Sequence, residues 1–304
     1  MSHKLYRSTD VGALPLTGQA GSLLAILDAL LPLHGWAKAY AATNVGAYRP
    51  GKGRRLYLQV DDTGTTSASV FGYEFMTSAT VGTGRFPDAR QAASANVVRK
   101  SSSADAVARP YWIVVGETFV YVFASISTTS LPDQPFVAVG GMFFGDLVDA
   151  LPNDPWAVAL IANDGVEQLG RVDSSLVAGA TVPGGHWIAR GAPGLPRPSS
   201  AWAVVVGAPA SATCLGRWGN GQLMADSVSR AVDMGRIHLY EAVGGNRTYR
   251  RRGRLPAMWA PALDTSSGQA LDTPWQGADP LKRSLRLLPV AAGAIQGAIA
   301  YREE

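Results

Sequence analysis

Apolar and polar side chains alternate along residues 56–60, where Leu56, Leu58 and Val60 fall on one side of the chain. Alternation with a period of two predicts a half-buried β-strand. The turn-forming segment DTGTT follows, and a second run, SASVFGYEFM, brings the chain back. The pattern therefore predicts an antiparallel hairpin.

Several later segments are continuously apolar and of strand length. PYWIVVGETFVYVFASIS predicts a hairpin with Gly116 and Glu117 at its tip, and PFVAVGGMFFGDLV and WAVALIAND predict buried strands. AWAVVVGAPA predicts another strand, a hairpin is expected about Gly244 and Gly245, and two last strands about Gly293. Roughly a dozen short strands predict a mainly β fold of sandwich-like or barrel-like antiparallel sheets.

One segment departs from this pattern. SLLAILDALL is apolar on nearly every side, with Asp28 as its only charge, which predicts a short buried helix from Ser22 to Leu31. We expect Ser22 to cap this helix, and Pro32 and Gly35 to end it. Few other helices are expected.

The loop before this helix contains glycine and raises the question of phosphate binding. Gly18 and Gly21 stand three positions apart and no lysine follows them, unlike a Walker loop. No G-x-G-x-x-G motif follows a predicted strand either. The favoured interpretation is a strand, a turn and a buried helix that begin a domain.

Length and composition bound the domain organisation. The chain has 304 residues, of which only 16% are charged, with 34 Gly and 19 Pro. This composition is typical of a globular protein with many turns. We expect an N-terminal arm or strand at 1–20, a mainly β domain at 21–150 and a second at 151–304, although the last two could form one compound domain.

Charge and cysteine content exclude several classes of protein. The net charge of +4 is too small to predict nucleic-acid binding, and the single cysteine, Cys214, excludes an intrachain disulfide.

No secretory signal is recognisable at the start. The apolar run at 22–33 is shorter than the about 20 residues that a membrane span needs. We therefore expect a soluble chain made in the cytoplasm.

No catalytic motif stands out. The four histidines have no metal-ligand spacing, and the chain has no G-x-S-x-G segment. Asp61 and Asp62 are adjacent, so that their side chains point to opposite faces of a strand, and the turn after them explains both. We expect no catalytic residue, no metal and no cofactor. Carboxylates that meet only in the folded chain leave glycan hydrolysis open.

Two kinds of residue are candidate contacts with a partner. In NRTYRRRGR, strand geometry predicts that Arg250, Arg252 and Arg254 share one face. They could bind anions, discourage edge pairing or contact an acidic neighbour, and the last two are favoured. Trp218 and Trp275 stand in loop-like contexts, where tryptophan is a frequent interface anchor or sugar platform, and an interface is favoured.

The opening stretch LYRSTDVGALPLTGQAGSLLAILDALL resembles a family of structural proteins from tailed bacteriophage virions. Further similar segments are YLQVDDTGTTSASVFGYEFM, RKSSSADAVARPYWIVVGETFVYVF, FFGD and RGRLPAMWAP, so that the resemblance covers most of the chain. It departs from the family at LPLHGW, where a longer glycine-rich loop is expected.

The resemblance implies a non-enzymatic virion component that packs against copies of itself and against other virion proteins. A place in the tail or baseplate is favoured, and a capsid decoration protein is the alternative. A tail protein that binds or cleaves host glycans is an alternative of another class. Residues 1–20 could be an arm that becomes ordered on a neighbour.

Overall fold

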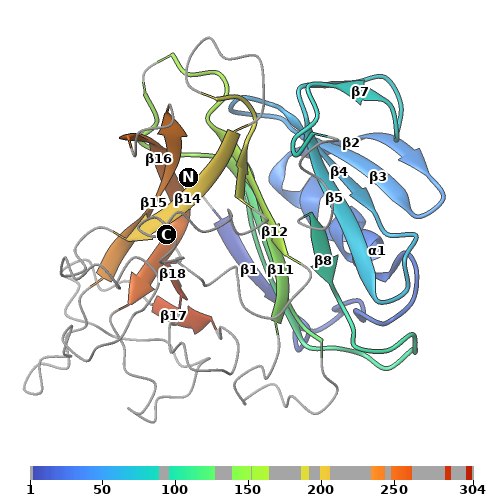
Figure 1. Cartoon of the computed structure of the whole chain (residues 1–304). Coiled ribbons are helices and arrows are strands. Elements are labelled where there is room, and N and C mark those ends of the chain that lie inside the picture. The colour runs from blue at the N-terminus through green and yellow to red at the C-terminus, as the bar shows by residue number, and fades with distance from the viewer. Residues whose placement is uncertain are drawn as a thin grey trace, which may run out of the picture.

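The computed structural model describes residues 3–88, 96–126, 139–151, 153–163, 186–191, 199–205, 234–243, 248–261, 285–288 and 299–302. These described residues form two main sheets and one short α-helix, arranged as in Figure 1. Every neighbouring pair of described strands is antiparallel. The predicted fold class, mainly β with antiparallel sheets in a sandwich-like arrangement, is confirmed.

The large sheet has eleven strands and runs through most of the chain. In spatial order they are β1 (His3–Arg7), β9 (Tyr111–Gly116), β10 (Phe119–Ser125), β11 (Val139–Asp146), β12 (Val158–Asn163), β13 (His186–Ile188), β14 (Ser199–Val205), β15 (Met234–Val243), β16 (Thr248–Pro261), β18 (Ile299–Arg302) and β17 (Leu285–Leu288). β11 and β12 pair with each other, so the sheet continues across residue 150.

The small sheet has five strands and carries a short hairpin. Its strands, in spatial order, are β2 (Trp36–Ala42), β3 (Val45–Pro50), β4 (Tyr57–Asp61), β5 (Ser67–Tyr73) and β8 (Val97–Arg99). The hairpin consists of β6 (Phe75–Met76) and β7 (Gly82–Thr83).

Three predicted hairpins are confirmed as strand pairs. β4 pairs with β5, β9 with β10, and β15 with β16. The two predicted last strands are β17 and β18, which pair with each other. Gly244, Gly245 and Gly293, about which turns were predicted, lie outside the described residues.

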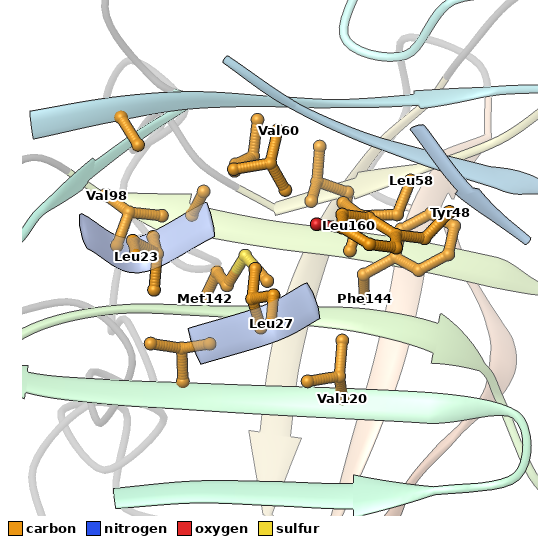
Figure 2. Close-up of a cluster of buried hydrophobic side chains, with 14 of the residues drawn as sticks. Leu23, Leu27, Tyr48, Leu58, Val60, Val98, Val120, Met142, Phe144 and Leu160 are labelled. Atoms are coloured by element: carbon orange, nitrogen blue, oxygen red, sulfur yellow. The ribbon is translucent and has the colours of Figure 1, made fainter. Parts of the chain in front are cut away.

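The predicted buried helix is α1 (Ser22–Leu30), and a 3₁₀ turn (Leu31–His34) continues it up to Gly35. Leu23 and Leu27 are fully buried. Figure 2 shows both leucines between strands of the small sheet and strands of the large sheet. The helix is apolar on nearly all sides because it is covered from both directions.

The central strands of the large sheet are buried on both faces. Alternate side chains enter two cores, one shared with α1 and the small sheet, and one on the opposite face of the large sheet. The first core contains Val120, Val122, Met142, Phe144 and Leu160, and the second contains Tyr121, Phe123, Phe143, Leu239 and Leu255. Double burial explains why these strands are continuously apolar in sequence.

The N-terminal segment belongs to this fold. β1 pairs with β9 over its whole length, and Leu5 lies in the second core. Leu16 is fully buried in the first core and forms a β-bridge with Arg109. Residues 3–20 therefore contribute a strand and core side chains to the fold.

Candidate interaction surface

The N-terminus of α1 is occupied by a carboxylate of the chain itself. Gly21 precedes the helix in the left-handed conformation, with φ of 82°. Asp62, immediately after β4, accepts hydrogen bonds through Oδ2 from the backbone N–H groups of Leu23 at 2.8 Å and Leu24 at 3.1 Å. A helix N-terminus favours an anion at this position. The place where a phosphate would bind is therefore filled by Asp62.

The prediction that Ser22 caps the helix is wrong. The Ser22 hydroxyl donates to the backbone oxygen of Thr17 at 2.8 Å, and no side chain of the cap position bonds to the helix. Asp61 has its predicted role, since its Oδ1 accepts hydrogen bonds from Thr63 in the turn. The prediction that Asp62 is also a turn residue is wrong, because its side chain is fully buried and binds the helix. Capping comes from a residue that is distant in sequence.

Lys100, immediately after β8, is the partner of Asp62. The two side chains form an ion pair and both are fully buried. Lys100 Nζ also donates to the backbone oxygen of Gln19 at 2.6 Å. Burial raises the pKa of Asp62, and the bond to Lys100 opposes this; burial lowers the pKa of Lys100, and the bond to Asp62 opposes that.

The arginine-rich segment lies in β16, where a bulge changes its alternation. Tyr240 of β15 is opposite Arg251 and Leu239 is opposite Gly253, which leaves Arg252 as the extra residue. Arg252 is fully buried, whereas Arg251 is exposed and Arg250 half-buried. The prediction that Arg250, Arg252 and Arg254 share one face is therefore wrong.

The buried arginine is paired inside the protein. Arg252 Nη1 donates to Glu241 Oε2 at 2.6 Å, and Nη2 donates to Asp154 Oδ2 at 2.9 Å. Arg254 forms an ion pair with Asp149 at the surface of the same strand. Arg252 is therefore not available to another protein, and Arg254 is already paired with a carboxylate of this chain.

Further arginines extend this network to the small sheet. Arg190 binds both carboxylate oxygens of Glu74, each at 2.5 Å, and stacks over the ring of Trp156 at 3.9 Å. Arg54 donates through Nε to the backbone oxygen of Asp154 at 2.8 Å. Its backbone N–H donates to Asp146 at 2.9 Å. These contacts fasten loops of the small sheet to the large sheet.

Sequence reasoning missed the acidic members of this network. Glu241 lies in β15 directly after Leu239 and Tyr240, and a charge beside these large side chains was the available signal. Asp154 precedes Pro155, and an aspartate at such a position is common in turns, so its sequence context does not indicate a buried ion pair. The structure assigns both to structural pairing.

The outward side of the β6–β7 hairpin has no charged side chain. Phe75 is opposite Thr83, and the backbone N–H of Thr77 donates to the oxygen of Val81 at 2.9 Å. Met76 points inward and is fully buried, whereas Phe75 and Val81 are 55% and 58% exposed. Because side chains alternate along strands, Phe75, Thr77, Val81 and Thr83 share the outward side. We call these four residues the hairpin face.

Aromatic rings and arginines lie beneath and beside the hairpin face. Phe71 and Tyr40 are half-buried and pack against the cluster that contains Met76. Arg85 lies over the Phe71 ring at 4.9 Å, and the Tyr40 hydroxyl donates to the Met76 backbone oxygen at 2.9 Å. The hairpin is thus held on the outer face of the small sheet, and Figure 1 shows β7 at its periphery.

Aromatic side chains and arginine are enriched at protein interfaces, and the hairpin face combines the exposed Phe75 with the neighbouring Arg85. The hairpin face is therefore the candidate interaction surface. The predicted interface residues Trp218 and Trp275 lie outside the described residues.

Other kinds of site were searched for in the same part of the chain. Within the described ranges, no three His, Cys, Asp or Glu side chains come together as a metal site would require. No helix among the described residues combines the length and apolar character needed to cross a membrane. No protein-family model matches the chain, and no curated protein matches it in sequence.

Proposed function

We propose that this chain is a non-enzymatic structural component of a bacteriophage virion. It is made in the host cytoplasm and packs, in multiple copies, against itself and other virion proteins, in the tail or baseplate. The proposal starts from the sequence resemblance, and the hairpin face is the structural observation that supports it best. A capsid decoration protein would use the same surface at another place in the particle.

The hairpin face supports assembly because its chemistry suits burial against a protein. Phe75 and Val81 are each more than half exposed, and the two threonines add no charge that would have to be desolvated. Apolar surface removed from water contributes about 25 cal/mol per Å². The buried Met76 side chain fixes the hairpin on the small sheet, and a preorganised segment loses little conformational freedom when a partner covers it.

The use of the charged residues supports the same proposal. Buried carboxylates at Asp62, Asp154 and Glu241 are all engaged by Lys100 or Arg252. Such pairs hold elements of the fold together and leave no exposed acid and base at these positions. A structural role accounts for them without an active site.

Replacing both Phe75 and Val81 with aspartate should prevent incorporation into particles while the chain stays folded. Interface anchors each contribute about 2 kcal/mol or more, and 1.4 kcal/mol is tenfold, so we expect at least a ~10-fold loss. Incorporation is measured by immunoblotting particles purified after complementation of a phage that lacks the gene. Circular dichroism of the purified variant checks the fold.

Val11→Asp is the matched control, because Val11 is fully exposed in another loop. This variant should be incorporated as the unaltered chain is. Normal incorporation of the Phe75→Asp/Val81→Asp variant would remove the hairpin face from the proposal.

A further inference from the structure

A lysine and an aspartate meet in the first core under unusual conditions. Lys100 and Asp62 are fully buried, they come from the ends of two different strands, and each is the other's only charged partner among the printed contacts of the described residues. The carboxyl group is oriented by two helix N–H groups, those of Leu23 and Leu24. The amine is oriented by the backbone oxygen of Gln19.

We propose that Lys100 and Asp62 become joined by an intramolecular isopeptide bond that the folded chain forms by itself. The bond links Nζ of Lys100 to Cγ of Asp62. It is a covalent modification independent of the proposed function, since it depends only on the geometry at the start of α1.

The reaction is a condensation without oxidant or reductant. A proton passes from the Lys100 ammonium to Asp62 Oδ1, which gives a neutral amine and a carboxylic acid. Nζ then attacks Cγ, and the negative charge that develops on Oδ2 is stabilised by the N–H groups of Leu23 and Leu24, as in an oxyanion hole. A second proton leaves Nζ for Oδ1, the Cγ–Oδ1 bond breaks, and water departs.

Burial favours the neutral reactants. Desolvation is the largest influence on both groups, and it raises the pKa of Asp62 and lowers that of Lys100. Both changes favour the uncharged forms that condense. The pair formed by Lys38 of β2 and Asp28 of α1 provides a contrast, because it is ion-paired at 2.8 Å but partly exposed to water. Water reaches both side chains of that pair, so we do not expect them to condense.

The product also fits the surrounding hydrogen bonds better than the ion pair. A lysine ammonium has three protons to donate, and the two acceptors found for Lys100 are Asp62 and the Gln19 oxygen. The amide has one N–H, which Gln19 accepts, and one oxygen, which Leu23 and Leu24 satisfy. Condensation thus replaces two buried charges with a fully bonded neutral group.

The intact mass of the purified full chain tests this proposal. We expect the chain to be lighter than its sequence by one water, about 18 Da. Tryptic digestion should yield the peptide 56–85 joined to the peptide that begins at Lys100, with no cleavage after Lys100. The mass of the unaltered chain is sufficient to test for the bond, so the test does not depend on whether a variant folds.

Two variants locate the bond. Lys100→Met should show its full sequence mass, because methionine has no nucleophilic nitrogen. Lys38→Met should still lack one water, because the exposed pair does not react. A full mass for the unaltered folded chain would overturn the proposal, and so would a loss of water without the joined peptides.

Discussion

Replacing Arg252 with methionine should lower the free energy of unfolding by about 3–5 kcal/mol, the usual cost of removing one partner from a buried ion pair. Methionine fills part of the volume but leaves the carboxylates of Glu241 and Asp154 buried, with their shared cation gone. β16 would also lose its attachment to the backbone of Arg190. Urea denaturation followed by tryptophan fluorescence measures the loss.

Arg254→Met is the control, two residues further along the same strand. Its pair with Asp149 is partly exposed to solvent, and exposed pairs contribute about 0–1 kcal/mol. A similar loss in both variants would mean that Arg252 is not an internal clamp. Combining Arg252→Met with Glu241→Gln and Asp154→Asn should recover part of the stability, since it removes the unpaired charges.

Phe144→Ala should lower the free energy of unfolding by a similar amount, about 3–5 kcal/mol. Phe144 is 1% exposed and lies among the side chains that join α1 and the small sheet to the large sheet (Figure 2). Its ring is 6.2 Å from the rings of both Phe86 and Trp36. Alanine would leave a cavity at the meeting point of the layers, which urea denaturation would detect.

Phe75→Ala is the matched control, because the same side chain is lost from the hairpin face. Surface substitutions away from such packing usually change stability by less than about 0.5 kcal/mol. We therefore expect Phe75→Ala to leave stability nearly unchanged while reducing incorporation into particles. A large loss of stability in Phe75→Ala would instead mean that Phe75 holds the hairpin in place.

The strands were predictable from sequence because their signals are local. The alternation at 56–60 and the turn after it placed β4 and β5 correctly, and the continuous apolar runs marked strands buried on both faces. The buried helix was equally clear, since it has one charge in ten residues. These features depend on neighbours within a few positions.

The buried ion pairs were much less predictable, because their members meet only in the folded chain. Asp62 lies 39 residues after the helix amide that it binds, and Asp154 lies 98 residues before Arg252. Simple alternation predicted that the Arg252 side chain is available to a partner. The bulge at this residue changes the alternation, and the side chain is buried. Sequence patterns contain no record of such distant pairings, nor of which strand face becomes covered.

The hairpin face shows the same limit. The segment SASVFGYEFM was predicted only as the return strand of a hairpin, and the sequence did not indicate which of Phe75 and Met76 would be exposed. In the structure the Met76 side chain is buried, and the adjacent Phe75 side chain therefore lies on the opposite, exposed side of β6. Only the packing of the hairpin against the small sheet determines which of these two side chains remains exposed.

Immunogold electron microscopy of intact phage particles, with an antibody against this chain, tests the proposed function most directly. Label at the tail end is the predicted result. Label spread over the head would contradict the placement and make the chain a decoration protein. Unlabelled particles, with the protein soluble in the lysate, would contradict the account of a virion component.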